Sequence, residues 1–523
     1  MNYADLFRVT LPETALELAA LVVLVVDLAF LRKATLKVRV TVAALLGVAG
    51  CGAALWALQF QSNNWFVLFD SSGSTLLLMG AYIKAAQTGI LVLTSLTLLL
   101  FIDSNFTRHV GEFVAVMLMA ATGGLLICGA QDLLVIFVGL ELLSLGLYIM
   151  TAFAKSSGKS AEAAMKYYLF GGMSAAFLLF GFSYFYGLSG STNLRDIQLA
   201  IAESGPSPLF YIACVLVVAG LGFKVAAVPF HLWAPDTYEG APTPAAAFIA
   251  SVSKVASFTL LLTLLQTWMT YQGMFGLGKH EADIILIHSD QTWFPLATIL
   301  LIVAAASMIV GNLAALAQVS VRRLLAYSAI AHAGYIMLGV AVYRAHTGNE
   351  SDSFYELYQV VVSEKAVLYY VLTYGLTIIG AFSVVSVVER ATGSDRLDSF
   401  LGLHKRNPLL AAVLLVLFLS LAGIPPLVGF WAKFNLFAAV LGVSAGPVPF
   451  ALVSLAIALS VVSLYYYLQV LKRAYVMPAI DETPIYVHPV TLAVHLLITT
   501  VVVVLGCFPA LLMRWIESFY PVI

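Results

Sequence analysis

Long runs of mostly apolar residues recur along this chain from one end to the other, and they decide what it can fold into. A run of about 18 or more such residues spans the hydrocarbon core of a bilayer as an α-helix. Of the 523 residues, 61% are hydrophobic and 10% are charged, whereas a soluble domain averages about 25% charged residues. We therefore predict an all-α polytopic membrane protein with fourteen transmembrane helices, at about 11–31, 39–60, 76–101, 112–129, 131–153, 165–188, 208–228, 243–268, 293–316, 324–343, 362–388, 408–441 with a break after 424, 448–472 and 488–513.

Lysine and arginine are distributed unevenly over the predicted connections. Fifteen of them follow odd-numbered spans, whereas the connections after even-numbered spans hold only Lys84, Arg195, Lys279 and Arg344. Because cytoplasmic connections are enriched in these two residues, odd-numbered connections are expected in the cytoplasm and both termini on the opposite side. Asp5, Glu13 and Glu17 stand near the N-terminus, unlike the cationic start of a cleaved signal peptide, so the first span is expected in the mature protein.

Two predicted spans are interrupted by prolines, one within 222–254 (GFKVAAVPFHLWAPDTYEGAPTPAAAFIASVSK) and one within 421–434 (LAGIPPLVGFWAKF). The backbone groups that proline frees need protein or water partners. The interruptions fall in spans seven and twelve, the fourth members of two successive groups of five helices. Matched interruptions in inverted repeats indicate a transport site. We predict three N-terminal transmembrane helices (1–111), a first five-helix repeat (112–268), a second, inverted five-helix repeat (293–473) and a C-terminal transmembrane helix (474–523).

Charged residues inside these spans are the candidates for function, since a charge near mid-membrane costs about 2.5–3.5 kcal/mol on insertion scales. Glu141 lies about nine residues, or about 13 Å, along its helix from Asp132. Ser144 and Tyr148 share its face. Lys224 precedes the first interruption and is the expected partner of Glu141, and a Lys–Glu pair whose separation changes would load and release a proton. A protonated packing carboxyl and a static ion pair are the structural alternatives.

Three further residues extend this set toward the second half of the chain. Lys254 has a serine three residues away on either side. His332 shares its helix face with a serine and a tyrosine, and histidine titrates near neutral pH, which suits a relay. A hydrogen-bonded core histidine is the alternative. Lys433 follows the second interruption as the corresponding charge of the second half. The predicted proton path is therefore Glu141, Lys224, Lys254, His332 and Lys433.

Other polar residues near the spans have simpler explanations. Lys166 and Lys365 lie near predicted span ends, where reaching for the membrane surface explains them as well as function does. His231 borders the first interruption and is equally suited to capping freed carbonyls. Asp236 and Glu239 are expected as loop or cap residues rather than as proton carriers.

No cofactor or metal site is expected in this chain. Residues 273–280, GMFGLGKH, match the GxxxxGK of a phosphate-binding loop but end in His280 and follow no strand. A metal site made from His280, Glu281, Asp283 and His288 fits no zinc spacing. The four cysteines are far apart and are expected to be small buried hydrophobes. A net charge of −1 without a basic run gives no indication of nucleic-acid binding.

Five segments together resemble the subunit N family of bacterial NADH:quinone oxidoreductase (respiratory complex I), whose mitochondrial and plastid homologue is subunit 2. They are GAQDLLVIFVGLELLSLGLY, AMKYYLFGG, GFKVAAVPFHLWAPDTYEGAPTP with SVSK, SAIAHAGY and LAGIPPLVGFWAKF. The resemblance covers essentially the whole length. It implies the antiporter-like fold with inverted five-helix repeats and broken helices seven and twelve. By motif position, Glu141 is similar to the family's fifth-helix glutamate, Lys224 to its seventh-helix partner, Lys254 to its central lysine and Lys433 to its twelfth-helix lysine.

The function implied by this resemblance is proton translocation driven by electron transfer in partner subunits. FMN, iron–sulfur clusters and quinone would belong to those partners, and this chain would be a non-redox subunit among other antiporter-like and small membrane subunits. We expect a bacterial inner (plasma) membrane with periplasmic termini, and a thylakoid membrane stays open. The alternatives are a subunit of a multi-subunit Na⁺/H⁺ antiporter, a structural spacer without pumping and, last, a solute transporter.

Overall fold

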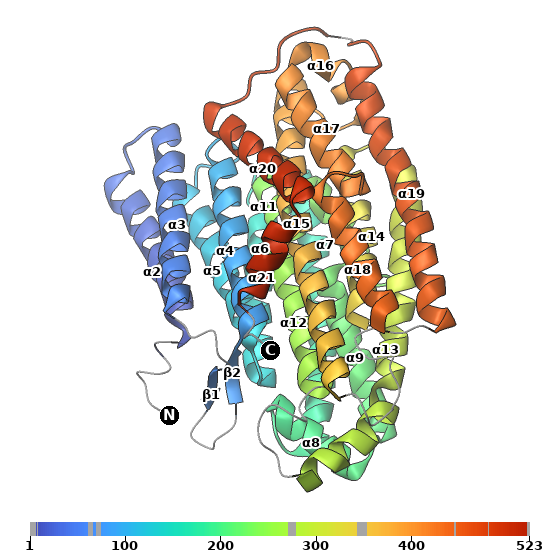
Figure 1. Cartoon of the computed structure of the whole chain (residues 1–523). Helices are drawn as coiled ribbons and strands as arrows, with labels where there is room; N and C mark the ends of the chain where they lie inside the picture. Colours follow the sequence, from blue (N-terminus) through green and yellow to red (C-terminus); the bar gives the residue numbers. More distant parts are fainter. Residues whose placement is uncertain are drawn as a thin grey trace.

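A computed structural model of the chain describes residues 7, 9–60, 66–69, 75–269, 279–341, 353–443, 446–479 and 481–519. Most of these residues belong to long helices that stand side by side in one bundle (Figure 1). Twelve helical stretches of the described residues are long and apolar enough to cross a membrane. The chain is therefore a multi-span helical membrane protein. The helices are α2 (Leu11–Val25) continued by the π-helix η1 (Val26–Phe30), α3 (Leu36–Gln59), α4 (Ala81–Phe101), α5 (Val110–Gly129), α6 (Leu133–Thr151), α7 (Gly158–Ser189), α8 (Leu194–Ser204), α9 (Pro208–Val225), α10 (Trp233–Gly240), α11 (Thr243–Ala250), α12 (Val252–Met269), α13 (Lys279–Leu316), α14 (Val321–Ala341), α15 (Ser353–Thr392), the 3₁₀ turn η3 (Leu397–Phe400), α16 (Leu403–Arg406), α17 (Pro408–Ala422), α18 (Val428–Val443), α19 (Pro447–Tyr475), α20 (Pro489–Cys507) and α21 (Ala510–Glu517).

The region before α4 differs from the prediction. Strand β1 (Phe66–Phe69) pairs antiparallel with β2 (Thr75–Met79), with Phe66 opposite Met79. The third span therefore starts as a helix at Ala81 rather than at residue 76, because the apolar run from Thr75 to Met79 is a strand. Lys84, which we counted with a connection, lies inside α4. The two strands lie at the same end of the bundle as α8, an amphipathic helix that we had not predicted (Figure 1).

Side-chain caps fix where several helices begin. Asp132 Oδ1 accepts hydrogen bonds from the backbone N–H of Leu134 at 2.8 Å and of Val135 at 3.3 Å, which satisfies two donors that the first turn of α6 leaves free. Asn407 caps α17 in the same way, and Pro408 occupies the first helical position, where its missing N–H costs nothing. These caps set the register of the residues that follow on each helix.

Both predicted interruptions are confirmed. Helix α9 ends at Val225 because Ala226 takes a left-handed conformation (φ 59°), and the chain does not become helical again until α10. Helix α17 ends at Ala422 because Gly423 takes a left-handed conformation (φ 87°), which glycine adopts at little cost. The prolines that follow each end cannot donate a backbone hydrogen bond, which prevents a regular helix from continuing.

A third interruption was not predicted. Ser251 separates α11 from α12, with φ −116° and ψ −76°, three residues before Lys254. No proline or glycine marks this position in the sequence. Lys254 therefore lies in the first turn of α12 rather than in the middle of a long helix.

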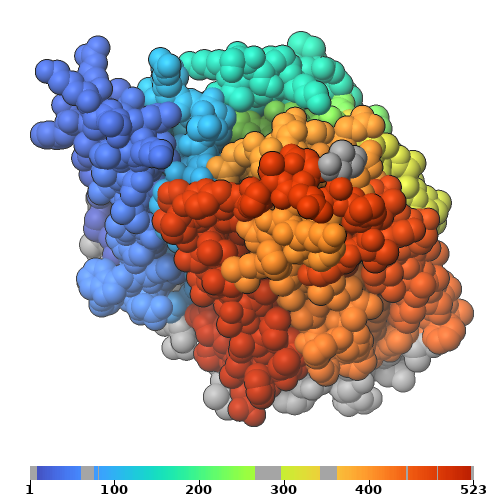
Figure 2. Space-filling view, turned by 90° about the horizontal axis from the view of Figure 1, so that it is seen from above, coloured from blue at the N-terminus to red at the C-terminus, as the bar shows by residue number. Residues whose placement is uncertain are grey.

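The helices differ in how much of their surface the protein covers. The most apolar stretch of α11–α12 is fully buried and that of α14 is 94% buried, whereas only 28% of the corresponding stretch of α19 is covered. The N-terminal helices, in blue, stand at one corner beside the red C-terminal segment (Figure 2). The centre of the bundle is therefore built from α11, α12, α14 and α15, the helices that carry Lys254 and His332 or pack against them.

Candidate functional site

Side chains from other helices hold the first interruption in place. Ser307 of α13 accepts a hydrogen bond from the backbone N–H of Val228 at 2.9 Å. The indole N–H of Trp233 donates to the carbonyl of Phe223 at 3.0 Å, and the ring of Tyr167 stacks on Trp233 with centroids 4.3 Å apart. Backbone groups that the interruption frees are thus satisfied by protein, as the low-dielectric surroundings require.

The second interruption is held in a similar manner. The hydroxyl of Ser420 accepts from the N–H of Gly429 at 3.2 Å, and the indole N–H of Trp431 donates to the carbonyl of Gly506 on α20 at 2.8 Å. A side chain at Gly506 would lie against backbone on the other side of this contact. The interruption and α20 are therefore packed backbone to backbone.

Each interruption also presents a carbonyl to a buried lysine. Lys254 donates from Nζ to the carbonyl of Val225, the last residue of α9, at 3.3 Å. Lys433 donates from Nζ to the carbonyl of Ala422, the last residue of α17, at 2.8 Å. The last carbonyls of a helix lack an intrahelical donor and lie at its negative end, so a cation there is favoured. In both halves of the chain, the last carbonyl of an interrupted helix thus binds a buried lysine.

Further contacts complete the two lysine sites. Lys254, 2% exposed, also donates to the carbonyl of Ala329 on α14 at 2.7 Å. Lys433, 6% exposed, also donates to Ser460 of α19 at 2.7 Å. Neither set of contacts, among the described residues, includes a carboxylate. An ammonium held by carbonyls and a hydroxyl is not locked in a strong ion pair, which leaves it free to give up its proton.

Lys224 is buried and lies beside α6. Its ammonium donates a short hydrogen bond to the hydroxyl of Ser144. Glu141 lies one turn earlier on the same helix, partly buried and within electrostatic range of Lys224. The two predicted partners are therefore neighbours, but the direct hydrogen bond of Lys224 goes to Ser144. A rearrangement of the lysine side chain is needed to turn this proximity into an ion pair.

His332 lies between the two central lysines. Its Nδ1 is 2.8 Å from the hydroxyl of Tyr370, and its ring is 4.8 Å from that of Tyr374 and 5.8 Å from that of Tyr335. Both Lys254 and Lys433 act on His332 electrostatically. The histidine is therefore surrounded by aromatic rings, with one hydroxyl bonded to it.

The tyrosines on either side of His332 reach the lysines. Lys254 Nζ is 5.9 Å from the centre of the Tyr374 ring, and Lys433 Nζ is 5.4 Å from that of Tyr335. Within the described part of the chain, the buried hydroxyls of Tyr374 and Ser257 have no hydrogen-bond partner. Buried hydroxyls are normally satisfied, often by water. These two mark polar room beside Lys254.

The structure places the predicted site residues in series. Lys224 immediately precedes Val225, whose carbonyl binds Lys254. Beyond Lys254 follow the aromatic residues around His332 and then Lys433. Glu141 stands at the other end, beside Lys224. Each of the five candidates thus neighbours the next, from Glu141 at one end of the series to Lys433 at the other.

Asp236 and Glu239 are not loop residues, which corrects the prediction. Both lie on α10, and Arg323 of α14 binds the carboxylate of Asp236 at 2.6 Å and that of Glu239 at 3.1 Å. Lys166 of α7 binds Asp236 at 2.7 Å, and Lys159 binds Glu239 at 3.3 Å. These ion pairs attach α10 to two neighbouring helices.

Most partners at the site were not predicted. Ser307, which binds the backbone of Val228, and Tyr370, which binds His332, carry no charge that would attract attention. The same holds for the backbone acceptors of Lys254 and Lys433 at the ends of α9 and α17. Ser144 was recognised only as part of a polar stripe. His231 lies at the first interruption and interacts with the backbone of Pro229. Lys365 lies 3.8 Å from Glu517.

The rejected cofactor motifs are only partly covered by the structure. Residues 273–278 lie outside the described ranges, as do the side chains of His280, Glu281, Asp283 and His288. In the ranges that are described, no three metal-ligating side chains come together. Cys51, Cys128 and Cys214 are buried as expected, whereas Cys507 is exposed, contrary to the prediction.

The fold and the site define a helical membrane protein in which buried lysines lie beside interrupted helices, an arrangement typical of ion-translocating proteins. The chain belongs to the family described as NADH:quinone oxidoreductase/Mrp antiporter, whose sequence profile matches residues 130–278 and 282–460. It is 46% identical to a protein of Acidobacterium capsulatum named NADH-quinone oxidoreductase subunit N 2, over 99% of each chain. It is 40% identical to NADH-quinone oxidoreductase subunit N 1 of Roseiflexus castenholzii, over 81% of this chain and 76% of that one.

Solved structures agree. A chain of respiratory complex I from Thermus thermophilus, with bound aureothin, aligns with a TM-score of 0.74 and 31% identity, over 96% of this chain and 98% of that one. A chain of the Mrp complex from Dietzia sp. aligns with a TM-score of 0.76 but only 20% identity, over 97% of this chain and 96% of that one, which shows a shared fold alone. The resemblance to the subunit N family is thus confirmed.

Proposed function

We propose that this chain is the proton-translocating membrane subunit N of an NADH:quinone oxidoreductase, moving protons along Glu141, Lys224, Lys254, His332 and Lys433. The observation that carries the proposal is a contact repeated at the two interruptions. The last carbonyl of α9 binds Lys254, and the last carbonyl of α17 binds Lys433. The near full-length similarity to subunit N proteins supports it.

The proposed cycle begins at Lys224. While its ammonium is bonded to Ser144, it holds a proton next to Glu141 without a direct ion pair. Electron transfer in partner subunits changes the electric field near Glu141 and Lys224. This change alters the distance between the two side chains. As the carboxylate moves away, the lysine loses the charge that stabilises its proton and passes the proton toward Lys254.

From Lys254 the proton moves to the second half of the chain. His332 accepts and donates through the hydroxyls and water that the tyrosines around it bind, and Lys433 receives the proton at the second interruption. Both lysines are held mostly by main-chain carbonyls, so the neutral amine left behind keeps its position. The residues do no redox chemistry, and NADH oxidation, FMN, iron–sulfur clusters and quinone belong to other subunits of the complex.

The proposal includes the topology. Twelve long helical stretches, with α2–η1 and the pair α17–α18 as two further spans, would make fourteen. Residues 112–268 and 293–473 form the two inverted five-helix repeats, 1–111 the three N-terminal helices and 474–523 the last span. In a bacterium both termini face the periplasm across the inner membrane. Cyanobacterial relatives named NAD(P)H-quinone oxidoreductase subunit 2 make a thylakoid membrane the alternative location.

The test is proton pumping by the assembled complex in inverted membrane vesicles, measured beside NADH oxidation. We expect Lys224→Ala and Glu141→Ala each to abolish most of the pumping. Lys365→Ala is the control, because the ion pair of this lysine on α15 is made with Glu517, which is not one of the five proposed path residues. If pumping stays coupled in both site variants, the mechanism is wrong.

A subunit of a multi-subunit Na⁺/H⁺ antiporter is the second candidate, because the Mrp complex shares the fold. The subunit N relatives at 46% and 40% identity favour the oxidoreductase. Purification of the chain separates the two. Copurifying flavin and iron–sulfur subunits support the oxidoreductase, whereas Na⁺-dependent H⁺ exchange without them supports the antiporter.

A further inference from the structure

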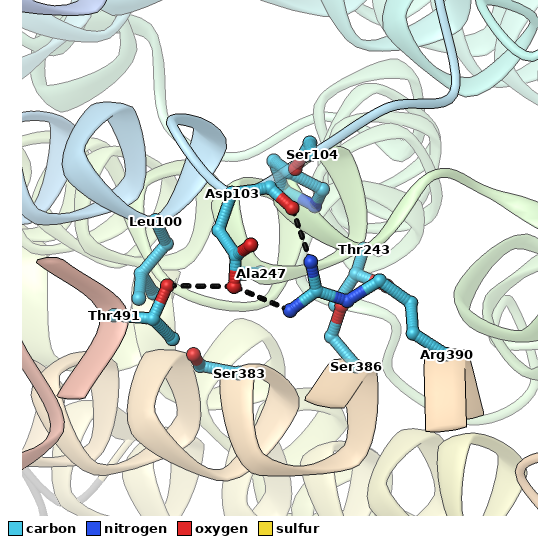
Figure 3. A pocket seen from close by; sticks show the side chains of 10 residues that line it. Leu100, Asp103, Ser104, Thr243, Ala247, Ser383, Ser386, Arg390 and Thr491 are labelled. Atoms are coloured by element: carbon cyan, nitrogen blue, oxygen red, sulfur yellow. Dashed lines mark hydrogen bonds and ion pairs between the residues drawn. The ribbon is translucent and has the colours of Figure 1, made fainter. Parts of the chain in front are cut away.

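A small cavity lies where four helices meet at one end of the bundle (Figure 3). Its volume is about 20 Å³, room for about one water molecule. Its walls come from the end of α4, the start of α11, the last turns of α15 and the first turn of α20. The lining residues are Leu100, Asp103, Ser104, Thr243, Pro244, Ala247, Ser383, Ser386, Arg390 and Thr491. Five of them are serine or threonine, so the cavity suits water.

An ion pair closes the solvent side of this cavity. Arg390 Nη2 lies 2.5 Å from Asp103 Oδ2, and Arg390 Nη1 donates to the main-chain carbonyl of Asp103 (Figure 3). Thr491 donates to the same carboxylate oxygen at 2.9 Å. Arg390 lies nearer the end of α15 than Ser383 and Ser386, so it stands on the outer side of the cavity. The side chain of Arg390 is 35% exposed, which leaves it free to swing into solvent.

The floor of the cavity leads toward Lys254. Ala247 lies one turn along α11 from Thr243, Ser251 lies one turn further, and Lys254 follows. From Ala247 to Lys254 the helix rise is about 10 Å. Ser251 donates to the carbonyl of Ala247 at 2.6 Å, so polar groups continue past the floor.

Small residues line the seam between α11 and α15 along this stretch. A Cβ atom on Gly375 of α15 would lie 3.5 Å from the Cβ of Ser251. Ala247, Ser251 and Gly375 are small, and the seam is packed, since the same Cβ atom would lie 2.8 Å from Leu93 of α4. A slight separation of α11 from α15 would therefore admit a file of water between the cavity and Lys254.

We propose that this cavity is the outer part of a water-filled inlet to Lys254 and that the Arg390–Asp103 ion pair is its gate. When Arg390 swings outward, Asp103 presents a carboxylate to incoming water and hydronium, and a proton passes along the file to the lysine. The inlet is separate from both helix interruptions. The role of protons in it rests on the proposed function, but access of water to the cavity does not.

The charge at the gate fits this role. Burial alone would raise the pKa of Asp103, but the hydrogen bond and the charge of Arg390 outweigh it and hold the pKa below its ordinary value. The hydrogen bond of Thr491 and the nearby His488 act in the same direction. The carboxylate therefore stays ionised at neutral pH, and the ion pair must separate physically for the gate to open.

The experiment is thiol labelling of the assembled complex in inverted membrane vesicles. A background with Cys507→Ser removes the exposed native thiol, because Cys51, Cys128 and Cys214 are buried. Ala247→Cys is placed in the floor of the cavity and treated with a charged, membrane-impermeant methanethiosulfonate reagent. Ala245→Cys is the matched control, since Ala245 is also fully buried but does not line the cavity.

We expect slow labelling of Ala247→Cys when Arg390 is present and at least about tenfold faster labelling when Arg390→Ala is added, with no change at Ala245→Cys. Arg390→Lys, which keeps the charge, should give an intermediate rate. The proposal is overturned if Arg390→Ala leaves the floor unlabelled, or if both thiols become equally reactive through general loosening. Labelling as expected in a chain whose Lys224 and Glu141 variants still pump would uphold the inlet and reject the proposed function.

Discussion

Replacing Arg322 with alanine should destabilise the protein more than any other single removal of an arginine near the first interruption. Arg322 is buried on α14 and donates to the carbonyl of Glu239 at 2.7 Å, to the carbonyl of Ala241 at 3.0 Å and to the hydroxyl of Thr243 at 2.7 Å. The acceptors join the end of α10 to the start of α11. One guanidinium therefore fixes the turn between the interrupted helix and the helix that leads to Lys254.

The magnitude follows from these contacts. A hydrogen bond to a charged group contributes about 1.5–3 kcal/mol, so three at the lower value give about 4–5 kcal/mol. Water can reach some acceptors after truncation, because Glu239 is partly exposed. We therefore expect Arg322→Ala to lower the free energy of unfolding by about 3–5 kcal/mol, the range for removing one partner of a buried charged contact.

The assay is equilibrium unfolding of the purified chain in mixed micelles of a mild detergent and SDS, followed by circular dichroism. Arg322→Lys should recover about one of the three bonds. Arg396→Ala, at an exposed position, serves as the control and should change stability by less than about 0.5 kcal/mol. A loss below about 1 kcal/mol for Arg322→Ala would refute the view that this guanidinium holds the turn.

Three further predictions concern other parts of the structure. Gly506→Ala should cost about 1–3 kcal/mol in the same unfolding assay, because the new Cβ would lie 2.1 Å from a carbonyl oxygen of the second interruption, whereas Gly172→Ala meets nothing within 4 Å and should be tolerated. Tyr374→Phe should slow pumping and increase the effect of deuterated water on the pumping rate, because the hydroxyl near Lys254 is lost. Tyr369→Phe removes another buried hydroxyl and should change neither the rate nor the isotope effect. Equal effects of the two substitutions would contradict the relay. The ratio of the floor labelling rates with and without Arg390→Ala should not change between pH 8 and pH 5, although both rates fall as the thiol becomes protonated. Despite its burial, Asp103 has a pKa that Arg390 holds below the ordinary value, so the ion pair is lost only as pH falls through that lowered pKa, and a ratio that shrinks toward one at pH 5 would contradict the assignment.

The sequence was sufficient to predict the interrupted helices and their lysines, because both are expensive in a membrane. Proline cannot continue a helix, and a charged side chain in the membrane needs a partner. Lys224 and Lys433 were therefore recognisable from the free-energy cost of placing a charge in lipid. The positions at which α9 and α17 end agree with that reasoning. Features that cost free energy in lipid are therefore visible in a single sequence.

Features that arise from packing between distant segments were not predictable. The interruption at Ser251 has no glycine or proline to mark it, and the strand Thr75–Met79 has the same apolar composition as a helix. The partner of Lys254 was invisible because main-chain carbonyls are present at every residue. The ion pairs of Asp236 and Glu239 depend on how α7 and α14 approach α10, which local patterns do not contain.

The carbonyls that hold Lys254 and Lys433 limit which substitutions the two helix interruptions can accept during evolution. An amide oxygen is too weak a base to take a proton from lysine. It therefore stabilises the ammonium without competing for the proton. A carboxylate in the same position would grip the ammonium and, once the proton had left, would itself be an unmatched buried anion. Straightening either helix would withdraw its oxygen into an ordinary helical bond and leave the lysine without support. A helix interruption and the lysine that its last carbonyl binds therefore depend on each other. Substitutions that remove one are expected to remove the other as well.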